Sequence, residues 1–163
     1  MTAFKHDMRV LLALAGTLLS GGAAAQLPVA PAPDQQRLLA SEDPRLAANK
    51  KLVYDFWREV VQTRDAERAS VYVAEGLAQH DPNVATGRAA FVRSFGQAPK
   101  LAVKATIDDL VSVVAEGDLV VLGFRRVLPD LAQEGQTYTT TWFEMLRVEN
   151  GKIAERWNYG TKE

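Results

Sequence analysis

His80 is the side chain of this sequence best suited to move a proton near neutral pH. It lies in the run QHDPN at 79–83, and the only other histidine, His6, belongs to a segment that we expect to be removed. An imidazole titrates close to neutrality, so a histidine that faces a cavity can act as a general acid or base. At the end of a strand, the same residue can equally be a hydrogen-bonded structural histidine.

Glu144 is the second candidate, because of the strand that we expect over 137–148. Side chains alternate between the two faces of a strand, so Trp142 and Glu144 share one face. An Asn-Gly turn follows and makes the next strand, which carries Trp157, the neighbour of the first. If both indoles point to the concave side, they enclose the Glu144 carboxylate and raise its pKa towards a value useful for proton transfer.

Arg126 is unusual because it lies in a strongly apolar strand predicted over 119–127, on the same face as Phe124. A buried arginine needs a carboxylate partner, and Glu144 is the natural candidate. Arg126 could therefore bind an anionic or oxygen-rich substrate, or it could simply neutralise Glu144. The carboxylate can also lie at the solvent side, in a cross-strand pair with Arg126 or Arg156.

Three further polar side chains could reach a cavity, namely Tyr54, Tyr72 and Asn158. The sequence has no cysteine, and its histidines are too few for a typical zinc site. It also has no glycine-rich phosphate loop or dinucleotide-binding fingerprint. We therefore expect neither a metal nor a cofactor.

The N-terminal segment predicts export. A positively charged N-terminal region and an apolar stretch precede three alanines that end at Ala25. This is the pattern of a signal peptide over 1–25. An uncleaved anchor is the alternative. Cleavage after Ala25 would give a periplasmic or secreted protein with no membrane attachment, composed of a Pro/Ala-rich linker (26–42) and a single domain (43–163). A formal net charge of -1 argues against a nucleic-acid partner.

Along the domain, helical patterns come first and extended patterns follow. Helices are expected from Asp43-Pro44, over 65–72 and over 88–95, with a short strand at 76–80; later strands are expected over 101–114, 119–127, 137–148 and 152–159. This order predicts an α+β fold in which helices cover one face of a curved antiparallel sheet.

Several of these runs resemble the motifs of SnoaL-like proteins in the nuclear transport factor 2-like superfamily. They are YVA at 72–74, AQHDPN at 78–83, GR at 87–88 and LRVENGKIAERWN at 146–158. The resemblance implies a cone in which a strongly curved sheet and N-terminal helices enclose a deep apolar pocket. It also implies a homodimer that binds a small apolar ligand or substrate and uses acid/base chemistry without a metal. In this resemblance, His80 matches the histidine of the family motif.

The sequence departs from the family pattern at several titratable positions. Glu144 stands where relatives often have aspartate, Arg156 replaces a histidine, Asn158 replaces an aspartate, and FRR at 124–126 replaces a His-x-His pair. Two functions therefore stay open. One is an enzyme that acts on a small apolar carbonyl compound, with Glu144 as base and His80 as its partner. The other is an exported binding protein that holds an apolar ligand without chemistry.

Overall fold

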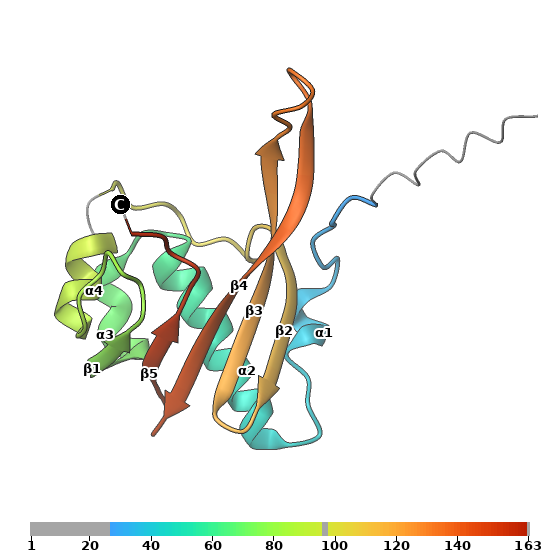
Figure 1. Ribbon diagram of the computed structural model, residues 1–163. Helices are drawn as coiled ribbons and strands as arrows, with labels where there is room; N and C mark the ends of the chain where they lie inside the picture. The colour runs from blue at the N-terminus through green and yellow to red at the C-terminus, as the bar shows by residue number, and fades with distance from the viewer. Residues whose placement is uncertain (1–26, 96–97, 163) are drawn as a thin grey trace, which may run out of the picture.

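The computed structural model describes residues 27–95 and 98–162, which form helices packed on one curved five-stranded sheet (Figure 1). This arrangement confirms the predicted α+β class. The helical elements are α1 (Gln35–Leu38), α2 (Pro44–Phe56), the π-helical turn η1 (Trp57–Val61), the 3-10 turn η2 (Ala66–Arg68), α3 (Ala69–Tyr72) and α4 (Arg88–Phe95). The strands are β1 (Val73–Gln79), β2 (Leu110–Glu116), β3 (Leu119–Pro129), β4 (Thr137–Glu149) and β5 (Lys152–Trp157).

The sheet has the strand order β1-β5-β4-β3-β2. Strands β2 to β5 form the predicted antiparallel meander, but β1 pairs with β5 in parallel, with Val73 opposite Ile153 and Gln79 opposite Arg156. The sheet is therefore mixed, which corrects the expectation of a purely antiparallel one. No hairpin joins β1 to β5, so nothing in the local chain forces them to run in opposite directions.

Helix α2 begins where the sequence predicts it. The Asp43 carboxylate accepts hydrogen bonds from the backbone N–H groups of Arg45 (2.8 Å) and Leu46 (3.4 Å), and a proline follows it at the first helical position. Val53 and Val60 are fully buried on the face that covers the sheet. The helix then widens into the π-helical turn η1, a distortion that is often found beside functional sites.

Strand β5 contains a β-bulge that the alternation of its sequence does not reveal. Val148 pairs with Ile153, whereas Arg147, one residue earlier on β4, pairs with Glu155. Ala154 is therefore an extra residue on β5. Because side chains alternate along a strand, one inserted residue exchanges the two faces for everything that follows it.

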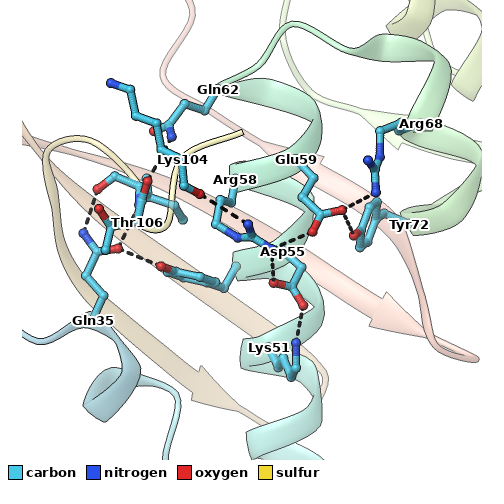
Figure 2. Close-up of polar contacts among 12 residues, drawn as sticks. Gln35, Lys51, Asp55, Arg58, Glu59, Gln62, Arg68, Tyr72, Lys104 and Thr106 are labelled. Carbon is cyan, nitrogen blue, oxygen red and sulfur yellow. Dashed lines mark hydrogen bonds and ion pairs between the residues drawn. The ribbon is translucent and has the colours of Figure 1, made fainter. Parts of the chain in front are cut away.

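The linker predicted over 26–42 packs against the domain in its described part. The Ala32 N–H donates to the Leu110 carbonyl (2.8 Å), and α1 follows directly. Gln35 is buried, where its amide donates to the Ile107 carbonyl (2.6 Å) and accepts from the Ile107 N–H (2.9 Å) (Figure 2). These bonds tie the segment to the edge of the sheet.

The far ends of β3 and β4 form a two-stranded arm that projects beyond the sheet (Figure 1). Pairing between β2 and β3 ends at Phe124, and pairing between β5 and β4 ends at Met145, whereas β3 and β4 stay paired as far as Pro129 and Thr137. On the side of β5, the edge of β4 beyond Met145 therefore has no strand paired with it among the described residues, and the Trp142 ring there contacts Tyr159 of the C-terminal segment.

None of the helices within 27–95 and 98–162 is long and apolar enough to cross a membrane. The predicted signal peptide over 1–25 lies outside the described residues, so its cleavage after Ala25 stays a prediction.

Candidate active site

A pocket of about 460 Å³ opens between the helices and the concave face of β4 and β5. Its wall comes from η1, the end of α4, the turn after β1 and the C-terminal segment. The lining residues are Trp57, Val61, Asp81, Asn83, Phe95, Trp142, Glu144, Arg156, Asn158, Tyr159, Gly160 and Thr161. Two of the predicted substrate-binding residues, Trp142 and Asn158, and one predicted catalytic residue, Glu144, are thus in the pocket.

Glu144 and Arg156 form a buried ion pair in this wall. Glu144 has no exposed surface and Arg156 is 4% exposed. The Arg156 Nε donates to Glu144 Oε1, while Glu144 Oε2 and Arg156 Nη1 make no hydrogen bond with any described residue. The pair therefore leaves one acceptor and one donor unsatisfied, both on residues that line the pocket.

Burial sets the protonation of Glu144. Removal from water disfavours the charged carboxylate, and it raises the pKa of Glu144 to about 7 although the Arg156 guanidinium acts in the opposite direction. A carboxylic acid with such a pKa exchanges its proton readily near neutral pH, which is what a general base requires.

Aromatic side chains form the apolar part of the pocket. Trp142 stacks on Phe124 with ring centroids 4.6 Å apart and lies 5.8 Å from Trp57 in a tilted arrangement. Phe124 is not itself in the pocket wall, and it acts as the support behind Trp142. Phe95, at the end of α4, adds a further ring to the wall and lies under the Arg156 guanidinium at 5.4 Å.

Asp81 and Asn158 lie together at another part of the pocket wall. The Asn158 Nδ2 donates to Asp81 Oδ2 at 2.8 Å, and the backbone N–H of Asn83 donates to Asp81 Oδ1 at 2.9 Å. The hydrogen bond from Asn158 is the main reason that the pKa of Asp81 lies below its ordinary value. Asp81 is thus a charged acceptor at neutral pH, in contrast to Glu144.

His80 lies on the opposite face of the sheet, so the prediction that it meets Glu144 is wrong. Its Nε2 is 2.7 Å from Glu155 Oε1, and its ring stacks on Trp157 with centroids 5.0 Å apart. Glu155 also accepts from Arg147 Nε at 2.9 Å. Nearly half of the His80 side chain is exposed, and the group belongs to a surface cluster.

Trp157 belongs to the same surface cluster, so it does not form a wall around Glu144. The bulge at Ala154 is the reason: before it Ile153 faces the core, and after it Arg156 faces the core while Trp157 faces outwards. The expectation that Ile153 and Trp157 share a face assumes a regular strand, and it fails at this residue.

Arg126 does not pair with Glu144. It is opposite Thr140 on β4, four residues from Glu144 along the projecting arm, and it is exposed. Its guanidinium lies over the ring of Tyr159 at 5.2 Å. The predicted buried pairing is therefore wrong for Arg126. The alternative partner, Arg156, takes that place, but as part of a buried pair and not a solvent-side one.

Tyr54 and Tyr72 are also outside the pocket. The Tyr54 hydroxyl donates to Gln35 Oε1 at 2.9 Å, and the Tyr72 hydroxyl donates to Glu59 Oε2 at 2.7 Å (Figure 2). Burial and the bond to the Glu59 carboxylate raise the pKa of Tyr72 to about 12. Both hydroxyls hold helices in place, and neither tyrosine lines this pocket.

The remaining lining residues were not predicted from the sequence. Trp57, the first residue of η1, could be expected only as part of the apolar stripe that continues from α2, and Asp81 only as a residue that ends a strand. Tyr159 follows the last strand and lies in an irregular segment. Among the described residues, no cluster of three or more His, Cys, Asp or Glu side chains is placed to hold a metal ion.

Residues 51–161 match the family model of the SnoaL-like polyketide cyclases. A candidate polyketide cyclase from Acidithiobacillus ferrooxidans is similar in structure, with 16% identity, a TM-score of 0.50 and coverage of 74% of this chain and 90% of that one. A candidate SnoaL-like polyketide cyclase from Jannaschia sp. CCS1 shows 16% identity, a TM-score of 0.50 and coverage of 72% and 88%. No curated protein matches the chain significantly.

At such identities the structural likeness supports the fold alone, which is the predicted nuclear transport factor 2-like fold. The family model covers most of the chain, including the strands that carry Glu144 and Arg156. The chain therefore belongs to the SnoaL-like polyketide cyclase family.

Proposed function

We propose that this protein is a cofactor-independent acid/base enzyme that acts on a small, largely apolar carbonyl compound, with Glu144 as its base. One observation carries the proposal: a carboxylate with no exposed surface and a pKa of about 7 lies in the wall of an aromatic pocket, and one of its oxygens has no partner among the described residues. Burying a carboxylate costs stability, and carboxylates whose pKa is strongly shifted by burial cluster at functional sites.

The unpartnered atoms of the pair suit proton abstraction next to a carbonyl. Glu144 Oε2 would take the proton from the α-carbon, and the electron pair of the broken C–H bond would move onto the carbonyl oxygen. Arg156 Nη1, also unpartnered, would donate to that oxygen as negative charge develops on it. The proton on Glu144 can then be replaced by one from solvent and delivered back to the same carbon, which gives exchange, or it can be delivered to another carbon, which gives isomerisation.

The rest of the pocket supports binding of an apolar body. Trp57, Phe95 and Trp142 offer ring faces and edges, and they keep water away from the carboxylate. Asp81 stays charged and fixed by Asn158, so it can accept a hydrogen bond from a hydroxyl of the ligand.

Exchange of α-protons with solvent deuterium tests the base without knowledge of the natural product. A panel of aryl ketones and β-dicarbonyl compounds is incubated with the protein in heavy water, and loss of the α-proton signal is followed by NMR. The Glu144→Gln variant should exchange at least about a hundredfold more slowly than the wild type. Glu149→Gln is the matched control, because Glu149 is exposed at the end of the same strand and should leave the rate unchanged. Equal rates for Glu144→Gln and the wild type would exclude Glu144 as the base.

A non-catalytic binding protein is the second candidate function. The observation that favours it is the position of His80, which leaves the described pocket wall without a histidine and ties Glu144 to an arginine. This alternative predicts that an apolar ligand copurifies with the protein, and that ligands bind without any exchange of their α-protons.

We further propose that the chain is exported and forms a homodimer. The outer face of the sheet supports the second point, because Val114 and Phe143 are 59% and 56% exposed there. Sedimentation of the wild type and of a Phe143→Lys variant tests it: the wild type should sediment as a dimer and the variant as a monomer. N-terminal sequencing of the exported protein tests the cleavage after Ala25.

A further inference from the structure

A second cavity adjoins the pocket at the base of the β3–β4 arm. It has a volume of about 350 Å³ and is lined by Arg126, Leu128, Thr140, Thr141, Trp142, Phe143 and Tyr159. Trp142 and Tyr159 also line the first pocket, so the two hollows share a wall. Trp142 and Tyr159 are thus the two rings that separate the first pocket from the second cavity.

The two rings of the shared wall differ in how firmly they are held. Trp142 stacks on Phe124, which is buried in the core. Tyr159 belongs to the irregular C-terminal segment, is 54% exposed, and contacts Trp142 in a tilted arrangement with centroids 6.4 Å apart. A rotation of the tyrosine ring would join the two hollows without disturbing the core.

Arg126 is the charged side chain in the lining of the second cavity. It forms no ion pair with any described residue, and its guanidinium lies over the Tyr159 ring at 5.2 Å. Its neighbour Arg125 faces the other side of β3 and is bound to Asp109, with the Arg125 Nε 2.7 Å from Asp109 Oδ1. No acidic side chain of the described residues thus neutralises the Arg126 guanidinium, and an anionic ligand could do so.

We propose that the substrate of this site is an elongated, largely apolar molecule with an anionic group, a carboxylate in the simplest case, at the end that Arg126 binds. The proposal rests on the proposed function, because it places the reacting carbonyl at Glu144 and the anion in the second cavity. A guanidinium matches a carboxylate with two parallel hydrogen bonds, and the apolar lining of the second cavity strengthens them.

The register of the strands sets the length of the molecule. Arg126 is opposite Thr140, and Glu144 lies four residues further along β4. At the rise of an extended strand this is about 13 Å. A two- or three-carbon acid is too short to reach both residues, whereas a chain or ring system with the carboxylate at its far end can do so.

Direct binding of a matched pair of probes tests the proposal. Pyrenebutyrate and pyrenebutanol share one apolar body and differ in the carboxylate, and their binding is followed by pyrene fluorescence at neutral pH. The wild type should bind the acid about tenfold more tightly than the alcohol. In Arg126→Met this preference should disappear through weaker binding of the acid, while the alcohol binds as before. Arg125→Met removes the same charge from the other face of the same strand and should keep the preference.

Several results would overturn the proposal. In the wild type, these are equal affinities for acid and alcohol, or no binding of either probe. In the variants, they are a preference for the acid that survives in Arg126→Met, or one that is lost equally in Arg125→Met. Urea unfolding of both variants confirms that they fold. Because the assay measures binding without turnover, a failure here is separate from a failure of Glu144→Gln to slow proton exchange.

Discussion

The Nε of Arg156 donates to Oε1 of Glu144 within the concave side of the sheet, although the two residues come from different strands and face the core for different reasons. Glu144 follows the regular alternation of β4. Arg156 faces the core only because Ala154 is an extra residue in β5. One bulge thus brings the guanidinium to the carboxylate, and it leaves each residue with one unpartnered atom.

The raised pKa of Glu144 makes a prediction about stability. The folded chain holds the proton at pH values where the unfolded chain, with an ordinary pKa of 4.5, has lost it. The protonated Glu144 therefore contributes to the free energy of unfolding in full below about pH 4.5. This contribution, roughly 3 kcal/mol at most, is lost as the pH rises to about 7. Urea unfolding across this range should show that fall in the wild type and not in Glu144→Gln. Parallel pH profiles of the two proteins would contradict the prediction.

Removal of Arg156 should be strongly destabilising. In Arg156→Met, the Glu144 carboxylate stays buried without its counter-charge, and the free energy of unfolding should fall by about 3–5 kcal/mol above pH 7. The loss should be smaller at pH 5, where Glu144 can take up a proton. The double variant Glu144→Leu/Arg156→Met should recover most of the stability, because it leaves no unpaired charge. Equal losses in the single and double variants would argue against the buried pair.

His80 should not contribute to chemistry in the pocket. Because its ring stacks on Trp157 on the outer face, His80→Asn should leave α-proton exchange within about twofold of the wild-type rate. The pH dependence of exchange should also be unchanged. A large loss of exchange in this variant, with an unchanged urea midpoint, would show that the imidazole reaches the substrate after all.

The hydrogen bond from Asn158 should stabilise the protein only while Asp81 is charged. The pKa of Asp81 is lowered mainly by this bond, so the stabilisation is present above the ordinary pKa of 3.8 and is lost as the pH falls through the folded-state value. Asn158→Leu should therefore be less stable than the wild type at pH 7, and the difference should shrink as Asp81 protonates. The effect should vanish in an Asp81→Ala background, which removes the acceptor of the bond, and its persistence there would point to a packing role for Asn158.

Much of the fold could be predicted from local sequence signals. Asp43 and Pro44 mark the start of α2, the Asn-Gly turn joins β4 to β5, and the alternation of β4 places Trp142 and Glu144 on the concave face. In each case a short-range preference and the burial of apolar side chains favour the same structure.

The assembly of the site could not be predicted in the same way. The bulge at Ala154 leaves no mark in the sequence, yet it decides that Arg156 and not Trp157 reaches the pocket. The direction of β1 beside β5 is set by a long-range pairing, and it carries His80 to the outer face. In the alternation of β3, Arg126 falls on the same side as the buried Leu122 and Phe124. It is exposed nevertheless, because it lies beyond the end of β2, where no further strand or helix of the described residues covers the arm.

The proposed chemistry depends most on the protonation of the Glu144 carboxyl group, and a carbon-13 NMR titration of this side chain measures it directly. Selective labelling of glutamate and comparison with Glu144→Gln assign the signal. We predict a midpoint near pH 7, well above the ordinary glutamate value of 4.5. A midpoint at or below the ordinary value of 4.5 would show that Arg156 holds Glu144 as a permanent anion, and it would contradict a base poised for proton transfer.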